Sequence, residues 1–174
     1  MSWLTNSMLK IACFLAVLHL VACWMQTPNV TKCSRSDFLF IQISGVTIGN
    51  AKVGLEMTVD AHVRVLKPIG SYPVLEVYVN TASGERLRCF HRYLPDELRL
   101  CRGRTVLERL FTEEWRNRCP LRSGLYSGHI VFKLPRTNST EKCIGDGHLV
   151  FTFKIRDEGY IFECVKFPVE IEQD

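Results

Sequence analysis

The sequence predicts an all-β domain in which two antiparallel sheets pack face to face. Three observations favour this fold class: several segments alternate apolar and polar residues, turn-forming residues separate these segments, and no repeat, low-complexity tract or linker divides the chain. Alternation with a period of two is typical of a strand with one buried and one solvated face. Many short strands of this kind need a second sheet to cover their apolar faces.

The clearest strand lies within residues 53–68, where polar residues separate a row of apolar ones: Leu55, Met57, Val59, Ala61, Val63 and Val65. The same alternation recurs in the segments 74–80, 129–135, 149–156 and 164–172. Turn signals separate the strands at 48–50, 67–73, 81–85 and 156–159. We therefore expect at least five strands, each with one apolar face.

One segment departs from the strand pattern. Apolar residues fall at helical spacing at Val106, Leu107, Leu110, Phe111 and Trp115. Thr105 precedes them as an N-cap, which predicts a helix over 105–116. The helix lies between Cys101 and Cys119, so a disulfide joining those two cysteines would fasten both of its ends to the sandwich.

Residues 1–23 have the features of a secretion signal. A lysine at position 10 precedes an apolar run over 11–23, which is shorter than the ~20 residues that span a bilayer but matches a signal-peptide core. We expect residues 1–23 to be a removed signal peptide and residues 24–174 to form the domain. A retained anchor and a bacterial lipoprotein signal ending at Cys23 are the alternatives. Glycosylation sequons at Asn29 and Asn138 argue against the lipoprotein.

Six cysteines remain after residue 23: Cys33, Cys89, Cys101, Cys119, Cys143 and Cys164. An even number in a secreted chain predicts three disulfides, although six cysteines allow 15 pairings and the sequence alone does not choose among them. Zinc sites need closely spaced cysteine pairs such as C-x-x-C, and the chain has none. We expect a secreted, extracellular protein, with the lysosome as a second compartment.

Arginine is concentrated in one part of the chain. The formal net charge is +4, yet the segment 86–122 holds ten Arg and no Lys beside five acidic residues. Such a segment is either a solvated basic face or a surface attracted to anionic headgroups or an acidic partner. Nucleic acid is not an expected partner, because a secreted chain rarely meets it and no base-stacking motif appears.

Catalysis is not predicted. The histidines after residue 23 are scattered and form no H-E-x-x-H motif, and no G-x-S-x-G elbow is present. In "GDGH" at 145–148, Asp146 lies near His148, but G-D-G is first a turn signal. We expect no catalytic residue, no metal site and no cofactor.

Three stretches of the chain carry a family resemblance: "CPLRSGLYS" at 119–127, "FKLP" at 132–135 and "YIFECVKFPVEIE" at 160–172. In this order they resemble the ML lipid-recognition family, and the resemblance covers roughly Cys33 to Ile171. The C-P-x-x-x-G-x-Y-S spacing and the long insert ahead of it are most similar to the ganglioside activator branch of that family.

The resemblance implies an immunoglobulin-like two-sheet sandwich with a lipid-sized cavity and one short helix in a disulfide-bounded insert. The implied cavity lining is Met57, Val59, Val77, Phe132, Phe151, Phe153 and Phe167. Without the resemblance, these side chains would be read as an ordinary packed core. Leu110, Phe111 and Trp115 of the predicted helix would act as a lid.

The resemblance also bears on the disulfides. Similar family members join the start of the domain to its closing strand, which implies a bridge between Cys33 and Cys164. With Cys101 and Cys119 bridged across the helical insert, Cys89 and Cys143 are left to pair with each other.

Two functions follow as hypotheses. In the first, a secreted lipid-binding or lipid-transfer protein holds an acyl chain, glycolipid or sterol between its sheets and meets an anionic membrane, a receptor or a lipid-processing enzyme. Burial of each methylene is worth ~0.8 kcal/mol, so an acyl chain could bind without polar recognition. In the second, a sandwich with a filled core binds a protein receptor through its surface.

Overall fold

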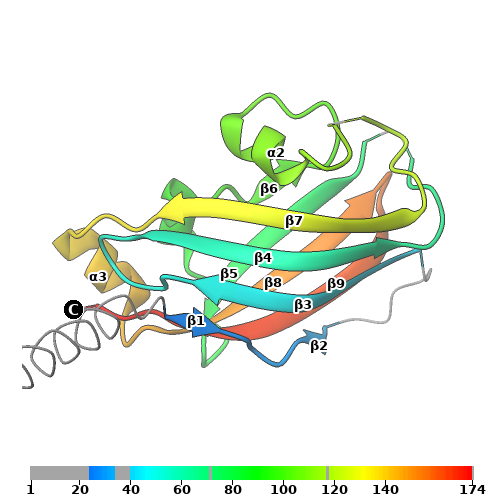
Figure 1. Cartoon of the computed structure of the whole chain (residues 1–174). Coiled ribbons are helices and arrows are strands. Elements are labelled where there is room, and N and C mark those ends of the chain that lie inside the picture. Colours follow the sequence, from blue (N-terminus) through cyan, green and yellow to red (C-terminus); the bar gives the residue numbers. More distant parts are fainter. Residues whose placement is uncertain (1–23, 34–39, 71, 117, 174) are drawn as a thin grey trace, which may run out of the picture.

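The computed structural model describes residues 24–33, 40–70, 72–116 and 118–173, so the predicted signal peptide lies outside the described residues. Two antiparallel sheets form a sandwich (Figure 1). The four-stranded sheet has the order β1 (Met25–Gln26), β3 (Ile41–Gly49), β4 (Glu56–Val65), β7 (Gly124–Lys133). The five-stranded sheet has the order β2 (Thr31–Lys32), β9 (Tyr160–Glu170), β8 (His148–Asp157), β5 (Val74–Thr81), β6 (Glu97–Arg99).

The register of the long strands directs their apolar faces inward. β4 pairs with β7 from Glu56 opposite Lys133 to Val65 opposite Gly124, so that alternate residues of both strands face the five-stranded sheet. In the five-stranded sheet, β8 lies between β5 and β9, and its inward residues are buried. The core therefore lies between the two sheets, as the alternating pattern predicts.

Helices are few and short. α2 (Val106–Phe111) begins with a capping box in which the Thr105 hydroxyl accepts from the Glu108 backbone N–H at 3.1 Å, while the Glu108 carboxylate accepts from the Thr105 N–H at 2.9 Å. The helix predicted over 105–116 is present, but its regular part ends at Phe111. The 3₁₀-helix η1 (Arg88–Arg92) and α3 (Asn138–Ile144) were not predicted.

The three disulfides of the structure are the three expected pairs, Cys33 with Cys164, Cys89 with Cys143, and Cys101 with Cys119. The first ties the end of β2 to β9, the second joins η1 to α3, and the third closes the insert that carries α2. The predicted fold class is confirmed as an all-β, immunoglobulin-like antiparallel sandwich with a short helix in a disulfide-bounded insert.

Candidate functional site

All seven predicted lining residues are buried between the sheets. Those of the four-stranded sheet are Met57, Val59 and Phe132, and those of the five-stranded sheet are Val77, Phe151, Phe153 and Phe167. Met57 lies directly opposite Phe132 on the neighbouring strand, and Phe151 lies opposite Phe167. The structure thus brings together the seven residues that the resemblance implies as a lining, whereas Leu55, which the alternation placed on the same apolar face, is 47% exposed.

Phe90 is one of the interior residues that sequence reasoning missed. Phe90 of η1 is buried, and its ring centroid lies 6.0 Å from that of Phe132 and 5.6 Å from that of Phe151. The Phe90 ring therefore joins the two sheets and fills the space between them at this point. Its neighbour Cys89 anchors η1 to α3, and this adjacent cysteine is the sequence signal that could have identified it.

The three predicted lid residues do not share one environment. Trp115 is buried and its indole N–H donates to the Leu100 carbonyl at 2.5 Å, while its ring lies 5.7 Å from Phe111. Phe111 packs so closely on β7 that a Cβ on Gly128 would lie 2.5 Å from its ring. Leu110, in contrast, is 44% exposed. Two lid residues thus fix the insert against the sheet, and the third faces solvent.

The opposite edge of the sandwich is held more loosely. β1 pairs only with Ile48 and Gly49 of β3, and β2 pairs only with two residues of β9. Residues 27–30, which we call the strap, cross between these two short pairings from one sheet to the other (Figure 1). The strap makes no hydrogen bond to any other described residue.

An opening of about 340 Å³ lies beneath the strap. Its walls are residues 27–32 and 43–46, and its floor includes Ile43 and Val46 of β3 and Val165 of β9. All three floor residues are buried and belong to the core, so the opening borders the packed core between the two sheets. In the sequence, Gly45 is the signal for this site, because it interrupts the alternation of β3 at a bulge.

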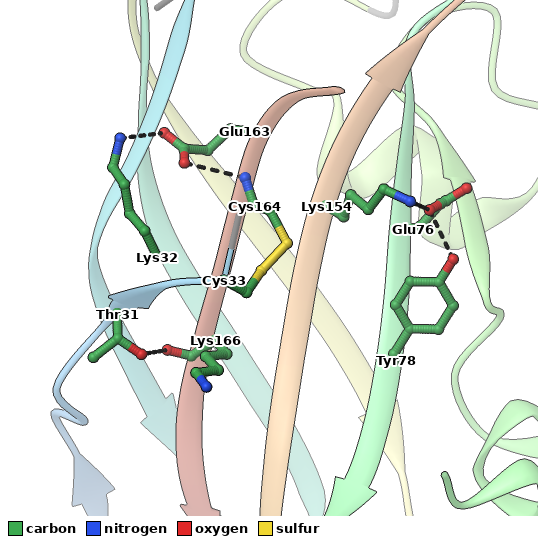
Figure 2. The surroundings of a disulfide bond; sticks show 9 residues. All are labelled: Thr31, Lys32, Cys33, Glu76, Tyr78, Lys154, Glu163, Cys164 and Lys166. Carbon is green, nitrogen blue, oxygen red and sulfur yellow. Dashed lines mark hydrogen bonds and ion pairs between the residues drawn. A yellow bond between two sulfur atoms is a disulfide. The ribbon is translucent and has the colours of Figure 1, made fainter. Parts of the chain in front are cut away.

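A buried carboxylate faces a lysine that lines the opening, and the pair is shown in Figure 2. Glu163 of β9 is 1% exposed; it accepts from the Cys164 N–H at 3.1 Å and faces the Lys32 ammonium at 3.6 Å. Burial raises the pKa of Glu163, and the charge of Lys32 only partly opposes this. Because Lys32 also lines the opening, a charged pair lies at its border.

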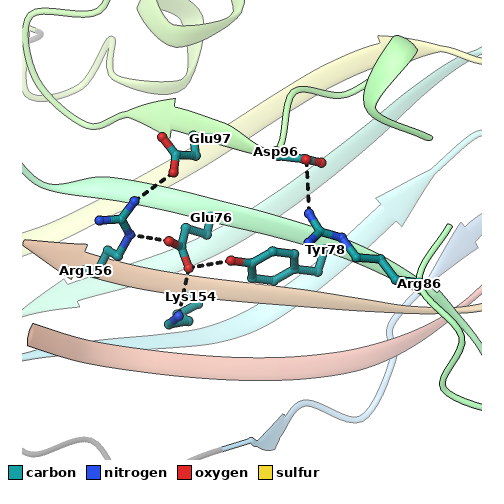
Figure 3. A network of polar contacts seen from close by, with 7 residues as sticks. All are labelled: Glu76, Tyr78, Arg86, Asp96, Glu97, Lys154 and Arg156. Atoms are coloured by element: carbon teal, nitrogen blue, oxygen red, sulfur yellow. Dashed lines mark hydrogen bonds and ion pairs between the residues drawn. The ribbon is translucent and has the colours of Figure 1, made fainter. Parts of the chain in front are cut away.

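The outer face of the five-stranded sheet carries a polar network (Figure 3). Glu76 accepts from the Tyr78 hydroxyl at 2.7 Å, pairs with Lys154 at 2.9 Å and accepts from Arg156, which also pairs with Glu97. Burial would raise the pKa of Glu76, but its hydrogen bonds, first that of Lys154, outweigh burial and hold the pKa below its usual value.

Tyr78 completes this network. Burial and the bond to Glu76 raise the pKa of Tyr78 to about 12, so the phenol stays protonated as a donor at neutral pH. The Arg86 guanidinium lies 4.5 Å from the centroid of the Tyr78 ring and pairs with Asp96 at 3.0 Å. The charged groups of the network are paired with one another, as expected of a surface with a structural role.

The residues considered for catalysis make contacts of the kind that stabilise a fold. The Asp146 carboxylate accepts from the His148 N–H at 3.0 Å, which is the bond of a turn. His129 Nδ1 lies 2.5 Å from the Asp60 carboxylate on the solvated face of the four-stranded sheet. Within the described ranges, His, Cys, Asp and Glu side chains form no group of three that could hold a metal ion.

The asparagines of both predicted glycosylation sequons are exposed, although Thr140 of the second sequon is buried. Asn29 belongs to the strap and lines the opening, and Asn138 is the first residue of α3. A glycan on Asn29 would lie at the rim of the opening.

Comparisons with known proteins found similarity to solved structures alone. No protein-family model matches the chain, and no curated protein matches its sequence. A solved Niemann-Pick type C2 protein from the Japanese carpenter ant is similar with 12% identity and a TM-score of 0.47, over 86% of this chain and 96% of that one. The C-terminal domain of wzt is similar with 10% identity and a TM-score of 0.42, over 88% of this chain and 80% of that domain.

Proposed function

We propose that this chain is a secreted lipid-binding and lipid-transfer protein that holds an acyl chain, glycolipid or sterol between its sheets. The observation that carries the proposal is the opening beneath the strap, whose floor consists of core residues from both sheets. The resemblance of residues 119–127, 132–135 and 160–172 to the ML family, and within it to the ganglioside activator branch, supports the same function.

The strap supplies a route for the ligand. Apart from the packing of Val30 against the core, it is held only at its two ends, so it can move aside at a smaller cost than a strand paired along its length. An acyl chain entering there would meet Val46 and Val165 first and then the aromatic side chains beyond them. Each methylene transferred from water contributes ~0.8 kcal/mol, so chain length rather than polar contacts would set the affinity.

Binding without chemistry is part of the proposal. The interior residues that would meet the ligand are aliphatic and aromatic, and they offer neither a nucleophile nor a general base. The protein would therefore present or deliver its ligand unchanged to a membrane, a receptor or a lipid-processing enzyme.

Three disulfides fit an extracellular or lysosomal protein, because such bonds persist in oxidising compartments. No helix in the described part of the chain combines the length and the apolar character needed to cross a bilayer.

A second candidate function is favoured by Phe90. Its contacts with Phe132 and Phe151 fill the interior at one point, as expected of a sandwich that binds a protein receptor through its outer surface. The two functions differ in whether the interior accepts a ligand.

Uptake of a fluorescent fatty acid tests the route beneath the strap. Thr27→Trp places a bulky ring at an exposed position that lines the opening, and Ala82→Trp places the same ring in an exposed turn elsewhere. We expect Thr27→Trp to slow uptake severalfold and Ala82→Trp to leave it at the wild-type rate. Equal rates in all three proteins would contradict this route.

A further inference from the structure

A second pocket lies at the far edge of the four-stranded sheet, where the insert after α2 meets β7. It has a volume of about 350 Å³ and is lined by Trp115, Tyr126 and three arginines, Arg116, Arg118 and Arg122, together with Glu114, Cys119 and Pro120. Because β4 separates β7 from β3, this arginine pocket is distinct from the opening beneath the strap.

Carboxylates of the described residues do not neutralise the three guanidinium groups. Among the described residues, none of them lies within ion-pair distance of a carboxylate. Glu114 is the only acidic residue of the lining, and its carboxylate accepts from the Ser127 backbone N–H. The pocket therefore has a net positive charge, whereas two other arginines, Arg86 and Arg156, have carboxylate partners.

The backbone of this pocket is held in place. The Arg116 N–H donates to the Glu113 carbonyl at 3.0 Å, and the Arg118 N–H donates to the Trp115 carbonyl at 3.2 Å. The disulfide between Cys119 and Cys101 then fixes the chain directly after Arg118.

Aromatic contacts fix the rest of the lining. The Tyr126 hydroxyl donates to the Arg122 carbonyl at 2.9 Å, and the Tyr126 ring lies 5.4 Å from that of Trp115. Because the backbone is held at each arginine, binding an anion would cost side-chain freedom but little backbone order.

We propose that the arginine pocket binds a phosphate monoester. The planar guanidinium fork matches two oxygens of a phosphate, and three such groups around one pocket can surround a dianion. The ester group would lie against the rings of Trp115 and Tyr126. The source of the phosphate is either a soluble metabolite or a lipid headgroup. The proposal stands apart from lipid binding, since it concerns another edge of the molecule.

Titration of the full chain with inorganic phosphate, followed by NMR of backbone amides, tests the site. We expect saturable shifts at residues 114–126. Arg118→Gln with Arg122→Gln should weaken binding at least tenfold, and Arg118→Lys with Arg122→Lys should also weaken it, because an ammonium cannot form the two-oxygen fork.

The matched control removes two arginines elsewhere, with Arg92→Gln and Arg136→Gln. Arg92 belongs to η1. Arg136 follows the end of β7 at Lys133, and at the rise of a β-strand Lys133 lies about 23 Å along β7 from Tyr126 of the pocket. This control should bind phosphate as the wild type does. The proposal fails if the lysine variant binds phosphate as the wild type does, or if the control loses as much affinity as the glutamine variant. Either result would mean that general electrostatic attraction explains the binding.

Vesicles distinguish the two sources. We compare phosphatidylcholine vesicles with and without phosphatidic acid, and glycerol 3-phosphate as a soluble monoester. If Arg118 and Arg122 are needed for binding to phosphatidic acid vesicles but not for binding of glycerol 3-phosphate, the ligand is a lipid headgroup. If binding of glycerol 3-phosphate depends on them equally, the ligand is a soluble monoester. If neither the phosphate titration nor the vesicles depend on these two residues, the proposal is wrong. Fatty acid uptake should be unchanged in these variants, which separates this result from the lipid-binding proposal.

Discussion

Among single residues, Phe90 makes the most direct connection between the sheets. It contacts Phe132 of one sheet and Phe151 of the other, and it is held by the Cys89–Cys143 disulfide beside it. The alternating pattern identified the seven predicted lining residues because they lie in strands. It could not identify Phe90, because a 3₁₀-helix of five residues has too few positions to show a period.

We predict that Phe90→Ala lowers the free energy of unfolding by about 3–5 kcal/mol, the cost of removing a buried phenyl ring. Leu125→Ala is the matched control, because Leu125 is 78% exposed. Denaturation with urea measures both variants. A loss below about 1 kcal/mol for Phe90→Ala would mean that its ring does not bridge the sheets.

Glu163 gives the protein a specific pH dependence. Its pKa is raised in the folded chain, mainly by burial, so the folded state keeps the proton to a higher pH than the unfolded state does. The contribution of Glu163 to the free energy of unfolding is therefore fully present below the ordinary glutamate pKa of 4.5. This contribution is lost as the pH rises through the raised pKa of Glu163 in the folded state.

We expect Glu163→Gln to raise the melting temperature at neutral pH, and the gain to shrink as the pH falls toward 4.5. Burial also raises the pKa of Asp157, so the difference between variant and wild type is the quantity to follow. The exposed Glu56, changed to Gln, serves as control. A gain that is constant over this pH range would contradict the assignment.

Among the elements, α2 and the insert that carries it are fixed against β7 by close packing. Phe111 contacts β7 at Gly128, where a Cβ would come within 2.5 Å of its ring. We predict that Gly128→Ala destabilises the protein by about 1–3 kcal/mol through overpacking.

A double-mutant cycle tests the cause. Phe111→Leu removes the ring atoms that the new methyl group would meet, so Gly128→Ala should cost clearly less in the Phe111→Leu background. If the losses in free energy of unfolding from the two substitutions are additive, the close approach of Phe111 does not explain why position 128 holds a glycine.

Strand prediction succeeded where the alternation was unbroken and failed where it was interrupted. β4, β5, β7, β8 and β9 were all predicted from their sequences. β3 was not, because the bulge between Ser44 and Thr47 shifts its register and hides its period. α3 was missed because its seven residues show a helical face too briefly, although Thr137 caps it by accepting from the Thr140 N–H.

In the molecule as a whole, the two edges of the sandwich differ. Trp115 and Phe111 lock one edge against β7, and the strap crosses the other with no hydrogen bond to the rest of the described chain. The sequence drew attention to the helix as the moving part, because its amphipathic pattern is conspicuous. The strap has no periodic pattern of apolar residues in the sequence. It is recognised only in the structure, from the short pairings of β1 and β2. The route proposed here therefore lies beneath the strap.

The central claim is that the interior accepts a lipid. The most direct test is organic extraction of the protein purified from secreting cells, followed by mass spectrometry of the extract and by fatty acid uptake of the stripped protein. The account predicts a bound lipid in an amount comparable to the protein, and saturable uptake after stripping. An extract without lipid, together with no uptake by a folded chain, would contradict it and favour a filled sandwich that binds a protein receptor.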